Sequence, residues 1–486
     1  MRLSELIQEN HAASRIEILG LSADSRAVQP GYLFAALSGT EQDGAAYIGS
    51  AIEQGAVAVL TGPHVPVPSK AVYVLADNNP RRRLALLAAK FYGAQPRTIA
   101  AVTGTNGKTS VAWFTRQIWE ILGYKAASIG TLGAIASGFP EAPSLTTPEP
   151  VTLHHTLADF AAAGIDHAVL EASSHGLAQY RLDGVRVSAA AFTNLTRDHL
   201  DYHHSEEEYF YAKKRLFAEV MPPGRVAVIN EDSPYASEIE SLCWARGNRI
   251  ISYGETGKDL RLLSITLSGT GQDIEVQYKD ARYAVHLPLA GKFQAMNVLA
   301  SAGLVIATTG MPTEMIFGAL EKLKPVPGRL ELVAKHPNGA PIFVDYAHTP
   351  DGLENCLAAL VPYAKGRLVA VFGCGGDRDA GKRPLMGAVA EEHADKAYVT
   401  DDNPRREDPA AIRAQIMEAC PHAIEIGDRR EAILAAIRDL KPEDVLVIAG
   451  KGHEQGQILA TETIPFNDGD VAREIVASLD GSGDAA

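Results

Sequence analysis

The sequence has few cysteines and no pattern that would pair them. Cys243, Cys356, Cys374 and Cys420 are the four cysteines in 486 residues, without a C-x-x-C pair or zinc-type spacing. Such sparse cysteines exclude a disulfide-stapled scaffold and favour reduced thiols in a cytoplasm-like compartment. We therefore predict a cytoplasmic protein and interpret Cys374, in FGCGG, as a small packing residue.

Basic charge and long apolar runs are also scarce. The chain has 45 Lys and Arg against 59 Asp and Glu, a net charge of −14, which argues against nucleic acid or an anionic membrane surface as the main partner. One uncharged run, Phe293–Thr313, is long enough to cross a bilayer but contains Gln, Asn, Ser, Thr, Gly and Pro. We expect it to form a buried soluble helix. The first ten residues, MRLSELIQEN, are unlike a signal peptide.

The length suggests several domains, since about 150 residues per domain is usual. Pro96 and the K-P-V-P-G run at 324–328 punctuate the chain as linkers do. We predict an α/β protein with three segments, at 1–96, 97–327 and 328–486.

The middle segment alternates strands and helices. TIAAVTG (98–104) predicts a strand, followed by a Gly-rich turn, a helix at 108–123 and a strand at 126–133. Further strands are predicted at 165–174, 188–196 and 225–230, so we expect a mostly parallel sheet with crossover helices.

In the last segment four predicted strands run into polar loops, at 340–348, 366–379, 396–405 and 444–456. Ligands bind at the carboxyl ends of strands in doubly wound sheets, so these loops form a natural second site.

The turn in TGTNGKT (103–109) carries part of a phosphate-loop motif. Gly107, Lys108 and Thr109 match G-K-[ST], but Val102 occupies the position of the first glycine. A loop of small residues before a helix can direct backbone N–H groups at a phosphate, with the lysine neutralising charge and the threonine hydroxyl on Mg²⁺. The alternative is a Gly-rich turn without a ligand.

Polar residues end later strands of the same sheet. Glu171 in LEASSHGL would suit Mg²⁺, which prefers oxygen ligands, and His199 in NLTRDHLDYH is a less usual ligand. Glu171 could instead cap a helix, and His199 could be a hydrogen-bonded core histidine. The pattern EEEYFYAKKRLF alone makes Lys213 a solvated surface lysine on a charged helix.

Ten motifs together resemble the Mur ligases of bacterial cell-wall synthesis over nearly the whole chain. In order they are TGTNGKT, LEASSHGL, FTNLTRDHLDYH, YxxAK, GKFQAMN, GRLE, DYAHTP, GDRDxGKRPLM, DDNPR and GKGHE. They are most similar to the branch that attaches the third residue of the stem peptide. The resemblance implies an N-terminal UDP-sugar-binding domain, a central P-loop-like mononucleotide-binding domain and a C-terminal Rossmann-like domain that binds the amino acid.

The resemblance also implies a reaction. The family's G-T-N-G-K-T loop does without the first Walker glycine, so Val102 is no objection to ATP binding. An ATP-dependent amide ligase is implied, which forms an acyl phosphate on UDP-MurNAc-L-Ala-D-Glu and adds a diamino acid in peptidoglycan precursor synthesis. Mg²⁺ is the implied cofactor, and a cytoplasmic monomer without membrane insertion is expected.

Site residues carry over from the matching motifs. For ATP they are Gly104, Thr105, Asn106, Gly107, Lys108, Thr109, Ser110, Asn297, Arg329 and Asp345, with His348 nearby and Gln294 where relatives often carry His or Asn. For the metal they are Thr109, Glu171, His199 and Lys213, the last carbamylated in the family. Lys108, Lys213 and His199 are the implied catalytic residues. For UDP-MurNAc-dipeptide they are Ser25, beside Arg26, with Thr146, Thr147, Ser173 and Arg181; DSRAVQPG could also be a plain Asp-Ser turn.

The loop TDDNPRRED identifies the amino acid. Relatives that add meso-diaminopimelate carry DNPR, and Arg405 here offers a bidentate fork to the distal carboxylate that lysine lacks. Arg378, Asp402, Asn403, Gly450 and Glu454 match the other positions around this amino acid. The alternatives are L-lysine as substrate, or an Asx turn in which Arg405 pairs with Glu407 or Asp408.

Two other functions compete with this interpretation. A folylpolyglutamate synthase also has a TGTNGK loop, although DNPR and GKGHE argue against it. The phosphate loop alone would fit a motor or switch NTPase, which hydrolyses ATP without needing acceptors.

Overall fold

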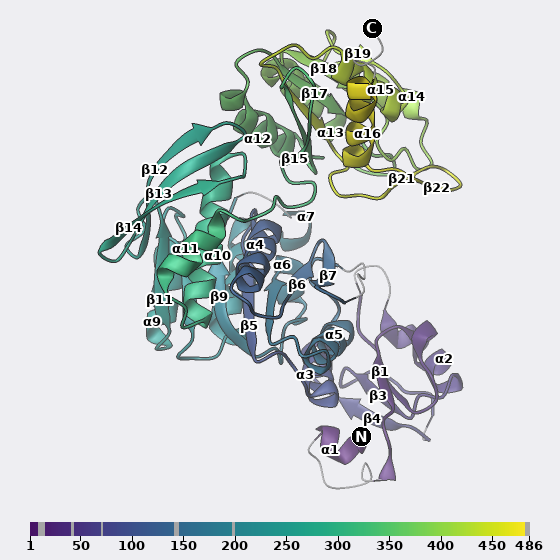
Figure 1. Cartoon of the computed structure of the whole chain (residues 1–486). Helices are drawn as coiled ribbons and strands as arrows, with labels where there is room; N and C mark the ends of the chain where they lie inside the picture. Colours follow the sequence, from purple (N-terminus) through teal and green to yellow (C-terminus); the bar gives the residue numbers. More distant parts are fainter. Residues whose placement is uncertain (8–14, 40–42, 70, 140–144, 197–199, 482–486) are drawn as a thin grey trace. The chain divides into compact units, whose positions relative to one another are not determined.

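The computed structural model describes residues 1–7, 15–39, 43–69, 71–139, 145–196 and 200–481 (Figure 1). The chain forms two compact units. One comprises Met1–Arg261 with Leu299–Ile316, and the other comprises Leu262–Val298 with Phe317–Ala486.

The N-terminal part contains a four-stranded parallel sheet. Its strands, in spatial order, are β1 (Gly20–Ser22), β2 (Tyr32–Ala35), β3 (Ala58–Thr61) and β4 (Tyr73–Ala76). The short helices α1 (Leu3–Ile7) and α2 (Ile48–Glu53) and the longer α3 (Pro80–Tyr92) accompany the sheet. Asn79 caps α3 by accepting from the Arg82 N–H, Pro80 occupies its first turn, and Gly93 ends it with a positive φ of 69°.

A ten-stranded sheet follows, in the order β14-β13-β12-β11-β10-β9-β5-β8-β6-β7. Five predicted parallel strands form its centre: β5 (Thr98–Thr103), β6 (Ala126–Gly130), β8 (His167–Glu171), β9 (Val187–Phe192) and β10 (Val226–Asn230). The parallel strand β11 (Arg249–Gly254), next to β10, was not predicted. The strand β7 (Gly133–Ala136) is antiparallel to β6. The accompanying helices are α4 (Lys108–Ile121), α5 (Pro150–Ala162), α6 (Ser174–Ala178), α7 (Leu200–His203), α8 (Glu206–Arg215) and α9 (Ala236–Ala245). The βαβ arrangement predicted around the Gly-rich turn is therefore present.

Three strands at one edge of this sheet were not predicted. They are β12 (Leu260–Ser268), β13 (Gly271–Tyr278) and β14 (Ala281–Leu287). Strands β13 and β14 form an antiparallel hairpin closed at Lys279, whose φ is 54°, and Asp280. The alternating polarity of QDIEVQY and ARYAVHL was the signal that could have revealed β13 and β14.

The uncharged run forms the helix α10 (Lys292–Thr308), followed by α11 (Thr313–Leu320). Ala295, Val298, Leu299, Leu304 and Val305 of α10 are buried, which confirms the predicted buried helix. In the part of the chain that the structure describes, no helix combines the length and apolarity needed to cross a membrane.

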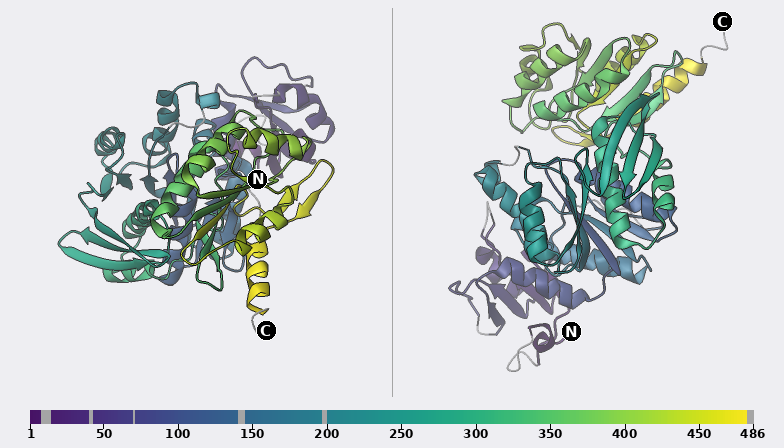
Figure 2. Two further views of the ribbon diagram at one scale, coloured as in Figure 1. Left: turned by 90° about the horizontal axis from the view of Figure 1, so that it is seen from above. Right: turned by 90° about the vertical axis from the view of Figure 1, so that its left-hand side faces the viewer.

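The C-terminal sheet has the order β15-β16-β20-β17-β18-β19. Its strands are β15 (Glu331–Lys335), β16 (Pro341–Asp345), β17 (Leu368–Phe372), β18 (Lys396–Val399), β19 (Ile424–Glu425) and β20 (Val445–Ala449), all parallel except β15. Separate apolar cores lie on its two faces, with the helices α12 (Pro350–Leu360), α13 (Lys382–His393) and α14 (Pro409–Met417) on one and α15 (Arg429–Arg438) and α16 (Asp468–Gly481) on the other (Figure 2). A small hairpin, β21 (Gly456–Ile458) with β22 (Thr463–Pro465), precedes α16. The four predicted polar loops therefore start from one edge of a doubly wound sheet. Cys374 is buried in the first of these cores, as predicted, and burial raises the pKa of its thiol to about 12.

Candidate active site

The predicted phosphate loop connects β5 to α4. Gly104 has a φ of 152°, and a Cβ there would lie 1.9 Å from Thr193 Oγ1, so a side chain does not fit. Gly107, with a φ of 87°, stands at the N-cap of α4. Val102 lies inside β5, fully buried, and pairs with Glu171 of β8 and Ala191 of β9. The missing Walker glycine is therefore a strand residue here, and the turn begins at Gly104.

The loop is held by the segment that follows β9. The backbone N–H of Thr105 donates to Asn194 O at 2.9 Å, and that of Asn106 donates to Asn194 Oδ1 at 2.9 Å. Thr193 Oγ1 donates to Asn106 O at 2.7 Å. Ser110, in the first turn of α4, is buried. These bonds fix the loop before any ligand arrives, which lowers the cost of ordering it on binding.

Two lysines meet at this loop. Lys108 Nζ donates to Gly104 O at 2.9 Å and to Thr105 O at 2.7 Å. Lys213 Nζ, from α8, donates to the same Gly104 oxygen at 2.7 Å and lies 4.3 Å from the ring centroid of Tyr209. The Tyr209 hydroxyl in turn donates to Thr105 Oγ1 at 3.1 Å.

The surface position predicted for Lys213 from its pattern was wrong, because its side chain is only 1% exposed. Tyr209 and Lys213 are spaced i, i+4 and share one face of α8. That face packs on the phosphate loop, while the acidic first turn of the helix is exposed. Because this helix is rich in charged residues, its sequence did not indicate that one face is buried.

Glu171, at the end of β8, joins the same loop from the other side. It is 2% exposed and accepts from Thr109 Oγ1 at 2.9 Å and from the Thr131 N–H at 2.8 Å. Gly130 makes room for it, since a Cβ there would lie 1.9 Å from Glu171 Oε1. The helix-capping alternative is wrong, because Ser173 caps α6 by accepting from the Gly176 N–H.

A cavity of about 10 Å³ lies between Thr109, Trp113, Gly130 and Glu171, which is room for about one water. The Thr109 hydroxyl and the Glu171 carboxylate supply oxygen donors that fit a hard cation such as Mg²⁺. His199 lies outside the described residues. Among the residues that are described, no group of three or more His, Cys, Asp or Glu side chains could hold a metal ion.

The predicted dipeptide residues of the central sheet cluster beside Glu171. Thr147 Oγ1 donates to Glu171 O at 2.7 Å and lies 3.0 Å from Ser173 Oγ. Thr146 Oγ1 lies 3.0 Å from Thr131 Oγ1. Arg181 Nη1 donates to Thr147 O at 2.8 Å, and burial lowers the pKa of this guanidinium. Four of the five predicted residues thus form one polar surface.

Ser25 lies apart from this cluster, in the N-terminal part. It begins a single 3₁₀ turn (Ser25–Ala27) capped by the Asp24 carboxylate, which accepts from the Arg26 N–H at 2.9 Å. The exposed Arg26 side chain pairs with Asp24 at 2.8 Å. This geometry is the Asp-Ser turn considered above, and a ligand role for Ser25 stays a prediction.

The other predicted nucleotide residues belong to the second compact unit. Asn297 and Gln294 are buried on α10, where Asn297 Nδ2 donates to Gln294 Oε1 at 3.0 Å. The Arg329 guanidinium lies 4.8 Å from the ring centroid of Tyr346. Asp345, at the end of β16, accepts from the Leu330 and Ala347 N–H groups at 2.7 and 2.8 Å.

Burial shifts the pKa of two side chains in this group, Asp345 and His348. It raises the pKa of the Asp345 carboxyl, against the opposing effect of Arg329 and the two backbone hydrogen bonds. Burial also lowers the pKa of His348, whose Nδ1 lies 2.8 Å from Tyr346 O. The neutral imidazole is therefore favoured near neutral pH.

The predicted amino-acid residues converge from the loops after β18 and β20. Asn403 Nδ2 donates to Glu454 Oε2 at 2.8 Å. Gly450 has a φ of 115°, and a Cβ there would lie 2.7 Å from Asp402 Oδ2. Lys451, which was not predicted from the sequence, contacts both Asn403 and Glu454. Its position between two glycines in GKGHE was the available signal.

Arg405 and Arg378 border these loops. Arg405 is half-buried, has a φ of 52° and donates from Nη1 to Gly376 O at 2.8 Å. Arg378 is exposed, with Nη1 3.3 Å from Asp377 O.

The alternative partners of Arg405 are engaged elsewhere. Glu407 pairs with Arg383 at 2.9 Å, and Asp408 caps α14 by accepting from the Ala410 N–H at 3.0 Å. Asn403 Oδ1 accepts from Lys451 and Ile458, contacts that an isolated Asx turn would not need.

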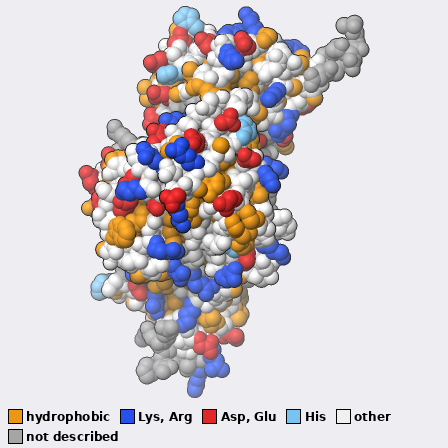
Figure 3. All heavy atoms as spheres, turned by 60° about the vertical axis from the view of Figure 1, so that its left-hand side comes forward, with side chains coloured by type: hydrophobic (Ala, Val, Ile, Leu, Met, Phe, Trp, Pro, Cys, Tyr) orange, Lys and Arg blue, Asp and Glu red, His pale blue; other side chains and the backbone are white. Residues whose placement is uncertain are grey.

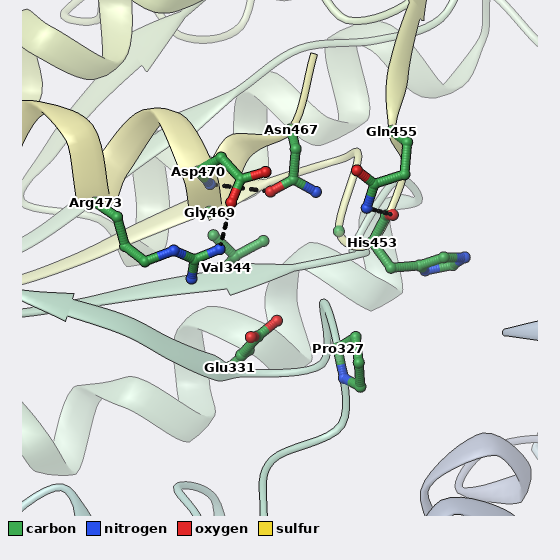
Figure 4. A pocket seen from close by; sticks show the side chains of 10 residues that line it. Pro327, Glu331, Val344, His453, Gln455, Asn467, Gly469, Asp470 and Arg473 are labelled. Atoms are coloured by element: carbon green, nitrogen blue, oxygen red, sulfur yellow. Dashed lines mark hydrogen bonds and ion pairs between the residues drawn. The ribbon is translucent and has the colours of Figure 1, made fainter. Parts of the chain in front are cut away.

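A cavity of about 170 Å³ lies behind the GKGHE loop (Figure 4). Pro327, Glu331, His453, Asp470 and Arg473 are among its lining residues. Arg473 and Asp470 form an ion pair of 2.7 Å within the wall, and Glu331 accepts from the Gly328 N–H at 2.8 Å.

Three family descriptions match successive parts of the chain. They are "Mur ligase family, catalytic domain" at residues 17–92, "Mur ligase middle domain" at 102–305 and "Mur ligase, glutamate ligase domain" at 328–452. The chain belongs to the Mur ligase family. Each match falls within one of the three predicted segments, whose boundaries stay a prediction.

Known relatives of this Mur ligase match nearly its whole length. A UDP-N-acetylmuramoyl-L-alanyl-D-glutamate--2,6-diaminopimelate ligase of Bradyrhizobium diazoefficiens is 52% identical, covering 98% of this chain and 99% of the relative. A solved structure with the same name is 32% identical with a TM-score of 0.74, covering 99% of each chain.

Folylpolyglutamate synthase of Mycobacterium tuberculosis is a more distant neighbour. It is 22% identical with a TM-score of 0.61, covering 76% of this chain and 92% of that one, which shows a shared fold alone. The predicted α/β, three-domain Mur ligase architecture is confirmed.

Proposed function

We propose that this Mur ligase is an ADP-forming ligase that joins meso-diaminopimelate to UDP-MurNAc-L-Ala-D-Glu in peptidoglycan precursor synthesis. Its 52% identity to a relative of that name supports the substrates. The observation that carries the chemistry is the convergence of Lys108, Lys213, Thr109 and Glu171 on one phosphate loop.

The proposed reaction forms the amide bond in two chemical steps. A carboxylate oxygen of the UDP-dipeptide attacks the γ-phosphorus of ATP, and the bond from that phosphorus to the bridging oxygen breaks to release ADP. The amine of the amino acid then attacks the acyl carbon, loses a proton, and expels orthophosphate as the C–O bond breaks. Phosphorylation gives the acyl carbon a good leaving group, phosphate, before the amine arrives.

Two anions must approach in the first step. The N–H groups in the first turn of α4 and the positive end of this helix would face the phosphates, and Lys108 can turn from the loop carbonyls to the transferring phosphoryl group. Thr109 and Glu171 would hold Mg²⁺. When bound, the cation supplies charge neutralisation between the nucleotide phosphates and the attacking carboxylate.

Carbamylation of Lys213 is part of the proposal. Two ammonium groups, from Lys108 and Lys213, share the Gly104 carbonyl oxygen, and like charges at this range repel. A carbamate on Lys213 would replace one of these cations with a carboxylate-like oxygen ligand beside the Gly104 carbonyl. His199 is proposed as a further ligand from its motif.

The amino-acid end depends on Arg405. Its guanidinium offers a planar fork to the distal carboxylate of diaminopimelate, which L-lysine lacks. The engagement of Glu407 with Arg383 and of Asp408 with α14 supports this use, because neither acid neutralises Arg405. Asp402, Asn403, Gly450 and Glu454 would surround the amino-acid centre, with Arg378 at the exposed side.

The nucleotide, sugar and cellular setting complete the proposal. Asn297, Arg329 and Asp345 would contact the base, phosphates and ribose, with Gln294 supporting Asn297. Ser25 would contact the uridine diphosphate. We also propose a monomer in the cytoplasm and domain boundaries at 96/97 and 327/328.

The test is ADP release measured with the UDP-dipeptide and either meso-diaminopimelate or L-lysine. Wild type should require both acceptors and prefer diaminopimelate. Arg405→Ala should raise KM for diaminopimelate ~100-fold through loss of a bidentate ion pair, while Arg406→Ala, at the exposed neighbouring position, should not. A wild type that prefers lysine, or an Arg405→Ala variant with full diaminopimelate turnover, would overturn the assignment.

A further inference from the structure

Lys451 is a buried cation at the amino-acid loops to which the proposed function gives no role. Its side chain is 0% exposed, and three oxygen atoms surround its ammonium group. Nζ contacts Asn403 Oδ1 at 3.0 Å, Glu454 Oε2 at 3.0 Å and Gly456 O at 2.7 Å. An ammonium has three N–H donors, so every donor is used.

Asn403 closes this arrangement into a ring. Its Oδ1 accepts from Lys451 and from the Ile458 N–H at 2.9 Å, while its Nδ2 donates to Glu454 Oε2 at 2.8 Å. The amide is therefore fixed in one orientation. The ring joins the loop after β18, which carries Asn403 and Arg405, to the loop after β20, which carries Gly450 and Glu454.

The ring also determines which part of Glu454 faces outward. Both side-chain donors that reach this carboxylate, from Lys451 and Asn403, contact Oε2. The Glu454 side chain is 32% exposed, in contrast to the enclosed Lys451. The other oxygen, Oε1, can thus receive a cationic group from solvent while Oε2 stays anchored.

Charge balance between Lys451 and Glu454 keeps the Glu454 carboxylate in this position. A buried ammonium needs a carboxylate partner, because removing either leaves an uncompensated charge. Since Lys451 neutralises Glu454 in the free protein, the carboxylate does not have to swing toward another cation before the substrate arrives. Preorganisation of this kind lowers the cost of binding.

We propose that Lys451 is a positioning residue for the diamino acid. It holds Asn403 and Glu454 in the geometry that receives an amino-acid ammonium, without touching the substrate itself. The inference rests on the proposed function and deepens it, because it predicts an effect confined to the third substrate.

The test compares kinetic constants for Lys451→Met and wild type. We expect KM for meso-diaminopimelate to rise on the order of 30-fold, the scale of a lost charge-assisted contact. KM for ATP and for the UDP-dipeptide, and kcat at saturating diaminopimelate, should stay within about twofold. Lys396→Met is the matched control: it removes a lysine that pairs with Asp439 at 2.9 Å in the same sheet, outside these loops, and should leave all constants unchanged.

A double-mutant cycle with Glu454→Gln separates positioning from general destabilisation. If Lys451 acts through Glu454, the double variant should have nearly the KM of the worse single variant; independent, multiplying effects would overturn the proposal. A fall in kcat with unchanged KM for diaminopimelate would also overturn it. Lys451→Gln, which keeps a donor, provides the same comparison if the methionine variant does not fold. A wild type that does not ligate diaminopimelate would refute the proposed function instead.

Discussion

Gly104 illustrates, at the scale of a residue, how the site depends on the absence of a side chain. A methyl group there would collide with Thr193 Oγ1 at 1.9 Å, and the same glycine offers its carbonyl to both Lys108 and Lys213. Displacement of this peptide would therefore move both lysines together.

We expect Gly104→Ala to reduce ADP release ~100-fold or more, because misplacement of catalytic groups by about 1 Å has effects of that size. Gly123→Ala is the matched control. Gly123 also has a positive φ, of 91°, but nothing lies within 4 Å of its Cβ position. The Gly123→Ala substitution should cost about 1 kcal/mol of stability, because alanine is strained at a positive φ, with little loss of activity. Comparable activity in the two variants would contradict the crowding argument.

The sequence predicted individual site residues unevenly. Thr109 and Glu171 follow from a phosphate loop and a strand end, and the structure joins them by a hydrogen bond of 2.9 Å. Lys213 could not be placed from its helix, because burial there depends on the face that packs on a loop 109 residues away. Lys451 was missed because a lysine between glycines has no periodic pattern that indicates burial.

At the scale of elements, α5 holds a buried histidine next to an exposed one. His154 is 1% exposed, its Nε2 lies 3.0 Å from Asp183 O, and burial lowers its pKa to about 4. In the unfolded chain its pKa is about 6.5. Between these values the unfolded state binds more protons, so stability falls as the pH is lowered from about 6.5 toward 4.

We expect His154→Gln to remove a contribution of roughly 2–3 kcal/mol from the pH dependence of the unfolding free energy in that window. His155→Gln, at the exposed neighbour on the same helix, should keep the wild-type dependence. Urea unfolding at pH 7, 6, 5 and 4 gives the comparison. Equal slopes for wild type and His154→Gln would show that this histidine is not the titrating group.

The helices α15 and α16 are joined by a buried ion pair. Arg429 contacts Asp468 through two bonds of 2.7 and 2.8 Å, with both side chains fully enclosed, and Arg429 Nη2 also donates to Ala449 O at 3.0 Å. The last bond anchors the end of β20, where the GKGHE loop begins.

Removing one partner of this ion pair should lower the free energy of unfolding. We expect Arg429→Met to lower the unfolding free energy by about 3–5 kcal/mol, since Asp468 would remain buried and unpaired. Arg430→Met, which breaks an exposed pair with Glu474, should cost less than about 1 kcal/mol. Denaturant unfolding distinguishes them, and equal losses would be inconsistent with a dominant role for the buried pair.

Strong local patterns made most elements predictable. The Ala- and Val-rich strands of the central and C-terminal sheets, each ending in Gly or polar residues, were located from the sequence. The strands β12 to β14 were missed because their half-exposed faces mix charged and apolar residues, and their pairing depends on an edge the sequence does not reveal.

At the scale of the whole molecule, a net charge of −14 coexists with a site proposed to bind anions. Acidic and basic side chains are interspersed over the face shown in Figure 3. Under the proposed function, phosphate recognition would therefore fall to local groups, the start of α4 and Lys108, rather than to a general positive field. The order of ten motifs made the family predictable, whereas the placement of Lys213 beside Lys108 required the fold.

The most direct measurement follows oxygen from the acceptor to the product. UDP-MurNAc-L-Ala-D-Glu labelled with ¹⁸O in the reacting carboxyl group is incubated with ATP and meso-diaminopimelate, and the released orthophosphate is analysed by mass spectrometry. We expect one labelled oxygen in orthophosphate for each amide bond formed, because the acyl phosphate breaks at the C–O bond. Amide formation with unlabelled orthophosphate would contradict the acyl-phosphate mechanism.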